Sequence, residues 1–144
     1  MVNEKFVGTW TLVSSEYRRS DGTVVYPQGK DTIGVLMYDK HGHMSVQIMN
    51  PHRPRFASGD QQKGTPAEVK AAFEGYISYF GDYEVDEAEN AVIHHTRGCL
   101  FPNLVGQAQK RFFEFSGNRL ILSTPPILAG GSPITGELTW ELSV

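Results

Sequence analysis

The chain has 144 residues, of which 40% are hydrophobic, 11% aromatic and 20% charged, which is typical of a single globular domain with its own core. Its formal net charge of −3 argues against sequence-independent binding to nucleic acid, which requires a basic face. The single cysteine, Cys99, excludes an internal disulfide and fits a reducing compartment. No apolar run approaches the roughly 18 residues of a membrane-spanning helix. Residues 1–6 do not resemble a secretory signal. We therefore expect one cytoplasmic domain over residues 1–144.

The first third of the chain predicts a strand followed by a hairpin. Residues 11–19 alternate with period two, which places Trp10 and Glu16 on the same face, and a strong turn follows at Asp21-Gly22. Residues 33–38 and 43–49 form the next hairpin. If Tyr38 pairs with His43, one face of this hairpin is wholly apolar and is the better candidate for the interior: Val35, Met37, Met44, Val46 and Ile48.

A long loop and a short helix come next. Residues 50–64 lack periodicity and contain several prolines and glycines, which is typical of a functional or mobile loop. Thr65 is a helix N-cap, with Pro66 at the first helical position and Glu68 three residues after the cap. The helix should run to about Gly75, and loop and helix together should cap one end of a barrel.

The second half of the chain predicts two hairpins and a final strand. If Val85 pairs with Val92, one face of the first hairpin carries Tyr79, Tyr83, Val85, Val92, His94 and Thr96. If Phe115 pairs with Leu120, one face of the second hairpin carries Gln109, Arg111, Phe113, Phe115, Leu120, Leu122 and Thr124. After a loop over residues 125–133, the last strand, 136–143, points Leu138, Trp140 and Leu142 inward. About eight strands joined by hairpins indicate an all-β fold, an up-and-down antiparallel barrel with room for packed side chains or one small ligand.

Short sequence runs along nearly the whole chain resemble the bacterial and fungal lipocalin-like domain family. The runs that carry the resemblance are Gly8-Thr9-Trp10-Thr11-Leu12-Val13-Ser14, Asp21-Gly22, Gly34-Val35-Leu36-Met37-Tyr38, Gly42-His43-Met44-Ser45-Val46, Ala71-Ala72-Phe73, Tyr79-Phe80-Gly81-Asp82-Tyr83, His94 and Pro102-Asn103. The resemblance implies a calycin-type barrel without signal peptide or disulfide, often encoded beside enzymes of secondary metabolism. Related small barrels act as cyclases and isomerases, which is an analogy of fold.

Arg111 is the charged candidate of the interior, and three interpretations of it stay open. A buried guanidinium needs an anionic partner or several acceptors, and Glu16 on the first strand would supply a carboxylate. Alternatively, Arg111 awaits a carboxylate or enolate on a ligand. The family resemblance offers a third role, because in lipocalins an arginine packs over the tryptophan equivalent to Trp10.

His94 is the candidate general acid–base, with Tyr83 as its partner or as a phenol donor. The alternative is a core histidine whose nitrogens are satisfied by a tyrosine hydroxyl. His94 and His95 cannot share a metal ion, because neighbours on a strand face opposite sides, and His41 and His43 flank a turn without a third ligand. We therefore expect no metal and no cofactor.

Three functions are compatible with this interior. The barrel is a binding module for a small apolar or aromatic molecule with an acidic or carbonyl group, a cofactor-free isomerase or cyclase, or a filled structural barrel. Catalysis would use His94, Tyr83, Glu16 and Arg111, and ligand contacts would come from Trp10, Tyr79, Thr96, Gln109, Phe113 and Trp140. We expect a small molecule as partner, no nucleic acid and no membrane, and leave a homodimer open.

Overall fold

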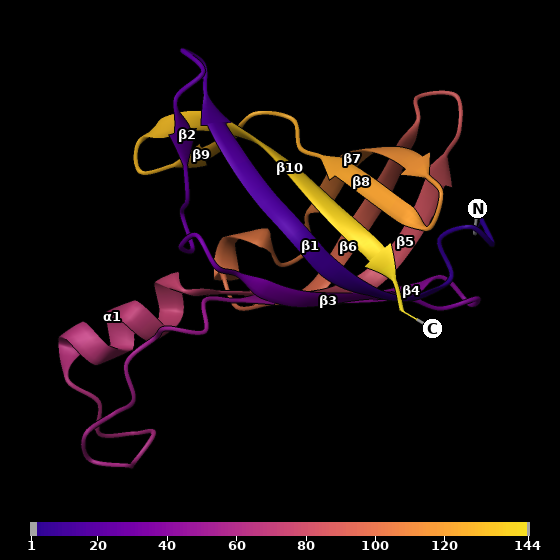
Figure 1. Cartoon of the computed structure of the whole chain (residues 1–144). Helices are drawn as coiled ribbons and strands as arrows, with labels where there is room; N and C mark the ends of the chain where they lie inside the picture. The colour runs from indigo at the N-terminus through magenta and orange to yellow at the C-terminus, as the bar shows by residue number, and fades with distance from the viewer. Residues whose placement is uncertain (1–2, 144) are drawn as a thin grey trace.

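The structure is a computed structural model that describes residues 3–143. The strands, helix and 3₁₀ turn follow one another along the chain (Figure 1): β1 (Gly8–Arg19), β2 (Val24–Val25), β3 (Ile33–Tyr38), β4 (His43–Met49), α1 (Pro66–Glu74), β5 (Tyr76–Asp86), β6 (Ala91–Cys99), η1 (Pro102–Leu104), β7 (Ala108–Ser116), β8 (Arg119–Ser123), β9 (Ile127–Ala129) and β10 (Ser132–Leu142).

Eight of the strands form a closed antiparallel barrel in the order β1-β3-β4-β5-β6-β7-β8-β10, and β10 pairs back with β1. The expected all-β, up-and-down barrel with one short helix is confirmed. Closure leaves no exposed sheet edge along these strands. The short strands β2 and β9 add to β1 and β10 at the end near α1, whereas both chain termini lie toward the other end (Figure 1).

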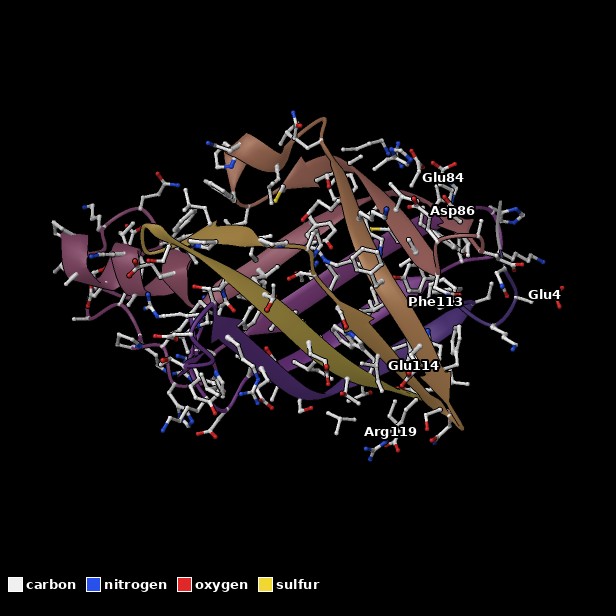
Figure 2. All side chains as sticks on the ribbon, turned by 90° about the horizontal axis from the view of Figure 1, so that it is seen from above. Glu4, Glu84, Asp86, Phe113, Glu114 and Arg119 are labelled. Carbon is white, nitrogen blue, oxygen red and sulfur yellow. The ribbon has the colours of Figure 1, made fainter. Side chains whose placement is uncertain are left out.

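Local sequence signals set the registers of two hairpins as expected. Val85 pairs with Val92 in the β5–β6 hairpin, and Phe115 pairs with Leu120 in the β7–β8 hairpin. The alternation leaves acidic side chains on the outside of the barrel, among them Glu84 and Glu114 (Figure 2). The predicted helix start is also confirmed, because Thr65 accepts from the backbone of Glu68 in a complete capping box.

The predicted faces of β1 are wrong beyond Leu12. A β-bulge between Leu12 and Ser14 in the pairing with β10 reverses which residues point inward, because side chains alternate with a period of two. Glu16 therefore lies on the outer surface, where it pairs with Arg18, and Tyr17 is buried in its place. Opposite Tyr17 stands Gly136, where a Cβ would overlap the tyrosine ring.

The register expected for β3 and β4 is wrong by one residue. Tyr38 pairs with Met44 rather than with His43, so five residues instead of four lie between the last paired residues of the hairpin. The carboxylate of Asp39 accepts hydrogen bonds from the backbone N–H groups of His41 and His43, at 2.9 Å and 2.8 Å, which stabilises the longer turn. Inward residues are Leu36, Tyr38, Met44, Val46 and Ile48, whereas Val35 and Met37 face outward.

The C-terminal segment also differs from expectation in two places. The predicted loop over residues 125–133 contains β9 and the start of β10. Leu138 and Trp140 are buried as expected, but Leu142 is 37% exposed. The loop over residues 50–64 extends away from the barrel, and no residue of α1 is buried (Figure 1).

One end of the barrel is filled by aromatic side chains. Phe6, just before β1, is fully buried and makes edge-to-face contacts with Tyr38, Phe113 and Phe115 at ring-centroid distances of 5.0 to 5.4 Å. Its carbonyl accepts a 2.9 Å hydrogen bond from the indole of Trp10. This end is closed, so access to the interior comes from the end with β2, β9 and α1.

Candidate functional site

Two cavities follow one another inside the open end of the barrel. The outer one, here called the mouth cavity, has a volume of about 320 Å³ and lies between β9, α1, η1 and the ends of β5 and β6. The inner chamber, about 50 Å³, lies deeper between the sheet walls. Four residues line both: Tyr17, Ile77, Tyr79 and Arg111. The interior is therefore not filled, and the mouth cavity falls in the range of small-molecule sites.

Arg111, on β7, is the charged residue at the junction of the two cavities. It is half-buried, and its two hydrogen bonds within residues 3–143 go to neutral acceptors, the carbonyl of Lys110 at 2.9 Å and Oε1 of Gln109 at 3.0 Å. None of the ion pairs among these residues includes it. The expected partner Glu16 lies outside, and Trp10 contacts Phe115 at the closed end rather than Arg111.

Gln109 holds Arg111 in position. Its side-chain N–H donates to the hydroxyl of Thr96 at 2.9 Å while its carbonyl oxygen accepts from Arg111. Thr96 is 2% exposed and Gln109 is 9% exposed, so this chain of polar groups is largely removed from water. The side chains of Thr96, Gln109 and Arg111 are hydrogen-bonded in series, and this series fixes the position of the guanidinium in the cavity wall.

His94, on β6, is a buried histidine with both ring nitrogens engaged. Nε2 lies 2.6 Å from the hydroxyl of Tyr38, and Nδ1 lies 2.8 Å from the hydroxyl of Tyr79. A neutral imidazole satisfies this arrangement by donating from one nitrogen and accepting at the other. Burial lowers the pKa of His94 to about 3, and the positive charge of Arg111 contributes. At neutral pH the ring is uncharged and is a weak base.

The tyrosines beside His94 also remain uncharged. Burial raises the pKa of Tyr38 well above its usual value and raises that of Tyr79. Tyr83 is a cross-strand neighbour of His94, but its hydroxyl donates to the carbonyl of Asp39 at 2.7 Å. The expected contact between Tyr83 and His94 is therefore wrong, because the longer turn after β3 offers Tyr83 another acceptor.

The remaining expected ligand contacts divide between the two ends of the barrel. Tyr79 lines both cavities, Gln109 lines the mouth cavity, and Trp140 lines the inner chamber. Trp10 and Phe113 lie with the aromatic groups of the closed end, and Thr96 lines neither cavity.

Sequence reasoning missed two residues of this interior. Strict alternation from Trp10 puts Glu16 inward and Tyr17 outward, and the bulge in β1 that reverses them has no sequence signature. The expected pairing of Tyr38 with His43 puts Tyr38 outward, whereas the turn is one residue longer and turns Tyr38 inward.

No metal site is formed within residues 3–143, where no three His, Cys, Asp or Glu side chains are arranged to hold an ion. His43 instead pairs with Asp39 at 2.8 Å, and His95 pairs with Glu84 at 3.0 Å on the outer face.

Among residues 3–143, no helix is long and apolar enough to cross a membrane.

A closed up-and-down barrel with an internal cavity at one end defines the calycin class of architecture. Within it, the chain belongs to the lipocalin-like domain family, whose model matches residues 7–142. The chain is 33% identical over 105 residues, 68% of its own length, to a protein of Aspergillus oryzae named 4′-hydroxy-3′-methoxypropiophenone carrier protein ppsC, and the match covers 95% of that relative. No solved structure matches the chain significantly.

Proposed function

We propose that this protein is a carrier that binds a small aromatic molecule with a carbonyl or acidic group inside the open end of the barrel. The observation that carries the proposal is Arg111, a half-buried guanidinium at the junction of two cavities without a carboxylate partner among the described residues. A guanidinium has five N–H donors, and an acidic or carbonyl oxygen on a ligand would supply a further acceptor beside the two neutral ones.

The walls of the mouth cavity suit an aromatic ring. Its apolar side chains come from several elements, and the polar ones are few and neutral apart from Arg111 and Glu74. Apolar wall residues that a ring would contact are Ile77, Leu100, Phe101, Ile127, Leu128 and Ile134. A volume of about 320 Å³ is at the lower end of the range for ligand sites, which favours a one-ring compound over a lipid.

The similarity to the carrier protein supports the same ligand class. That relative is named for an aryl ketone, and its match to this chain spans 95% of its length. An aryl ketone combines a flat apolar ring with one strong acceptor, which is the chemistry that the cavity and Arg111 offer here.

The surroundings of His94 favour a carrier over an isomerase or cyclase. Both ring nitrogens are held by tyrosine hydroxyls, and a pKa of about 3 makes the imidazole a poor base near neutral pH. Tyr38 and Tyr79 stay protonated for the same reason, burial. Recovery of an incubated aryl ketone should therefore yield the unchanged compound by mass spectrometry, and a time-dependent product would support the enzyme instead.

Calorimetry with matched ligands tests the role of Arg111. The wild-type protein should bind an aryl ketone more tightly than the hydrocarbon in which a methylene replaces the carbonyl. Arg111→Met should remove most of this preference, about 1.5–3 kcal/mol for a hydrogen bond to a charged group. Arg119→Met is the matched control, because Arg119 lies outside and approaches Glu141 at 3.7 Å. Equal preference in wild type and Arg111→Met would refute the proposed contact.

A further inference from the structure

The sizes of the two cavities impose an orientation on any ligand that occupies both. A cavity of about 150 Å³ lined by apolar side chains is known to accept benzene. The inner chamber is about 50 Å³, too small for an aromatic ring, whereas the mouth cavity of about 320 Å³ accepts one. The ring of a ligand must therefore remain in the mouth cavity.

The junction between the cavities carries the polar recognition. Arg111 lines both, together with Tyr17, Ile77 and Tyr79. A carbonyl group bound by Arg111 is thus held between the space that accepts a ring and the space beyond it. In an aryl alkyl ketone, the carbonyl likewise stands between the ring and the alkyl tail.

The walls of the inner chamber suit the alkyl tail. Most of its surface comes from buried apolar side chains, namely Leu36, Val46, Ile48, Leu122, Leu138 and Trp140. The polar groups of His94 are already paired with Tyr38 and Tyr79, so an alkyl group that enters displaces no hydrogen bond of that ring. Burial of each methylene in such a space favours binding.

Building on the proposed function, we propose that the inner chamber selects ligands by the length of the alkyl tail on the far side of the carbonyl. On the scale set by benzene, about 150 Å³ for six carbon atoms, one carbon atom needs roughly 25 Å³ of cavity. A chamber of about 50 Å³ then holds roughly two carbon atoms. The substrate class is an aryl alkyl ketone with a short tail, and longer tails are excluded by the closed end of the barrel.

A homologous series of 4′-hydroxyphenyl alkyl ketones, from the methyl to the heptyl compound, tests this inference by calorimetry. Affinity for the wild-type protein should rise roughly fourfold per added carbon until the chamber is full, because each buried methylene contributes that factor. Beyond that length, affinity should level off or fall. Affinity that keeps rising through the heptyl compound would overturn the inference while leaving the proposed function intact. Failure of every ketone to bind would refute the proposed function and this inference with it.

Variants of Val46 should move the preferred length in opposite directions. Val46 is 4% exposed on β4, lines the inner chamber and does not line the mouth cavity. Val46→Ala should lengthen the preferred tail by one or two carbons, and Val46→Ile should shorten it by about one. Ile48→Val serves as the enlarging variant if Val46→Ala does not fold.

Val13→Ala is the matched control, because Val13 is 44% exposed on the outer face of β1 and should leave the preferred length unchanged. A preferred length that stays constant in all folded chamber variants would overturn the inference.

Discussion

Replacing His94 by glutamine should flatten the dependence of stability on pH below neutrality. Glutamine can donate and accept hydrogen bonds between Tyr38 and Tyr79 but does not titrate, so the comparison isolates the charge of the imidazole. In the folded protein, burial holds the pKa of His94 at about 3, compared with an ordinary value of 6.5. The folded state therefore keeps the ring neutral over a range in which the unfolded chain takes up a proton.

The sign and the size of the effect follow from this difference. Between pH 6.5 and pH 3 the unfolded state binds more protons than the folded state at this residue, so stability falls as the pH falls. Each pH unit in this window costs about 1.4 kcal/mol. From pH 7 to pH 5, His94 should lower the free energy of unfolding by about 2 kcal/mol.

Urea denaturation of the wild-type protein and of His94→Gln at pH 7, 6 and 5 measures this contribution. The wild-type protein should lose about 2 kcal/mol more than the variant across this range. His95→Gln is the control, because His95 lies on the outer face beside Glu84, and it should follow the wild-type curve closely. Parallel curves for wild type and His94→Gln would refute a neutral, buried His94.

Three further substitutions test other parts of the fold. Gly81→Ala should destabilise the protein by roughly 3 kcal/mol in urea denaturation, because a methyl group there would overlap the backbone carbonyl of His95. An unchanged denaturation midpoint would contradict the tight contact between β5 and β6. Tyr83→Phe should cost about 1 kcal/mol by the same method through loss of the 2.7 Å hydrogen bond to Asp39, and a neutral effect would show that this bond contributes nothing. Thr65→Ala removes the helix N-cap and should speed amide exchange in α1 roughly fivefold, whereas unchanged exchange would argue against the cap.

The parts of the barrel that the sequence predicts correctly are those set by short-range signals. The β5–β6 and β7–β8 hairpins have alternating strands and recognisable turns, and pairs such as Val85 with Val92 follow directly. The helix start at Thr65 is correct because a capping box depends only on residues three apart.

The parts that the sequence does not predict depend on a single inserted residue. The bulge in β1 exchanges Glu16 for Tyr17 in the interior, and the longer turn after β3 brings Tyr38 inward. Bulges and turn lengths are decided by the pairing of whole strands and by contacts such as those of Asp39, so alternation alone cannot locate them. Both errors changed the candidate site, replacing an acidic group with two phenols.

Tryptophan emission during a titration with 4′-hydroxy-3′-methoxypropiophenone tests the central claim most directly. Trp140 lines the inner chamber, whereas Trp10 lies at the closed end and lines neither cavity. Binding inside the barrel predicts a saturable change in emission at one ligand per protein, which persists in Trp10→Phe and is lost in Trp140→Phe. A linear change without saturation, or a saturable signal that survives in Trp140→Phe and disappears in Trp10→Phe, would contradict binding at this site.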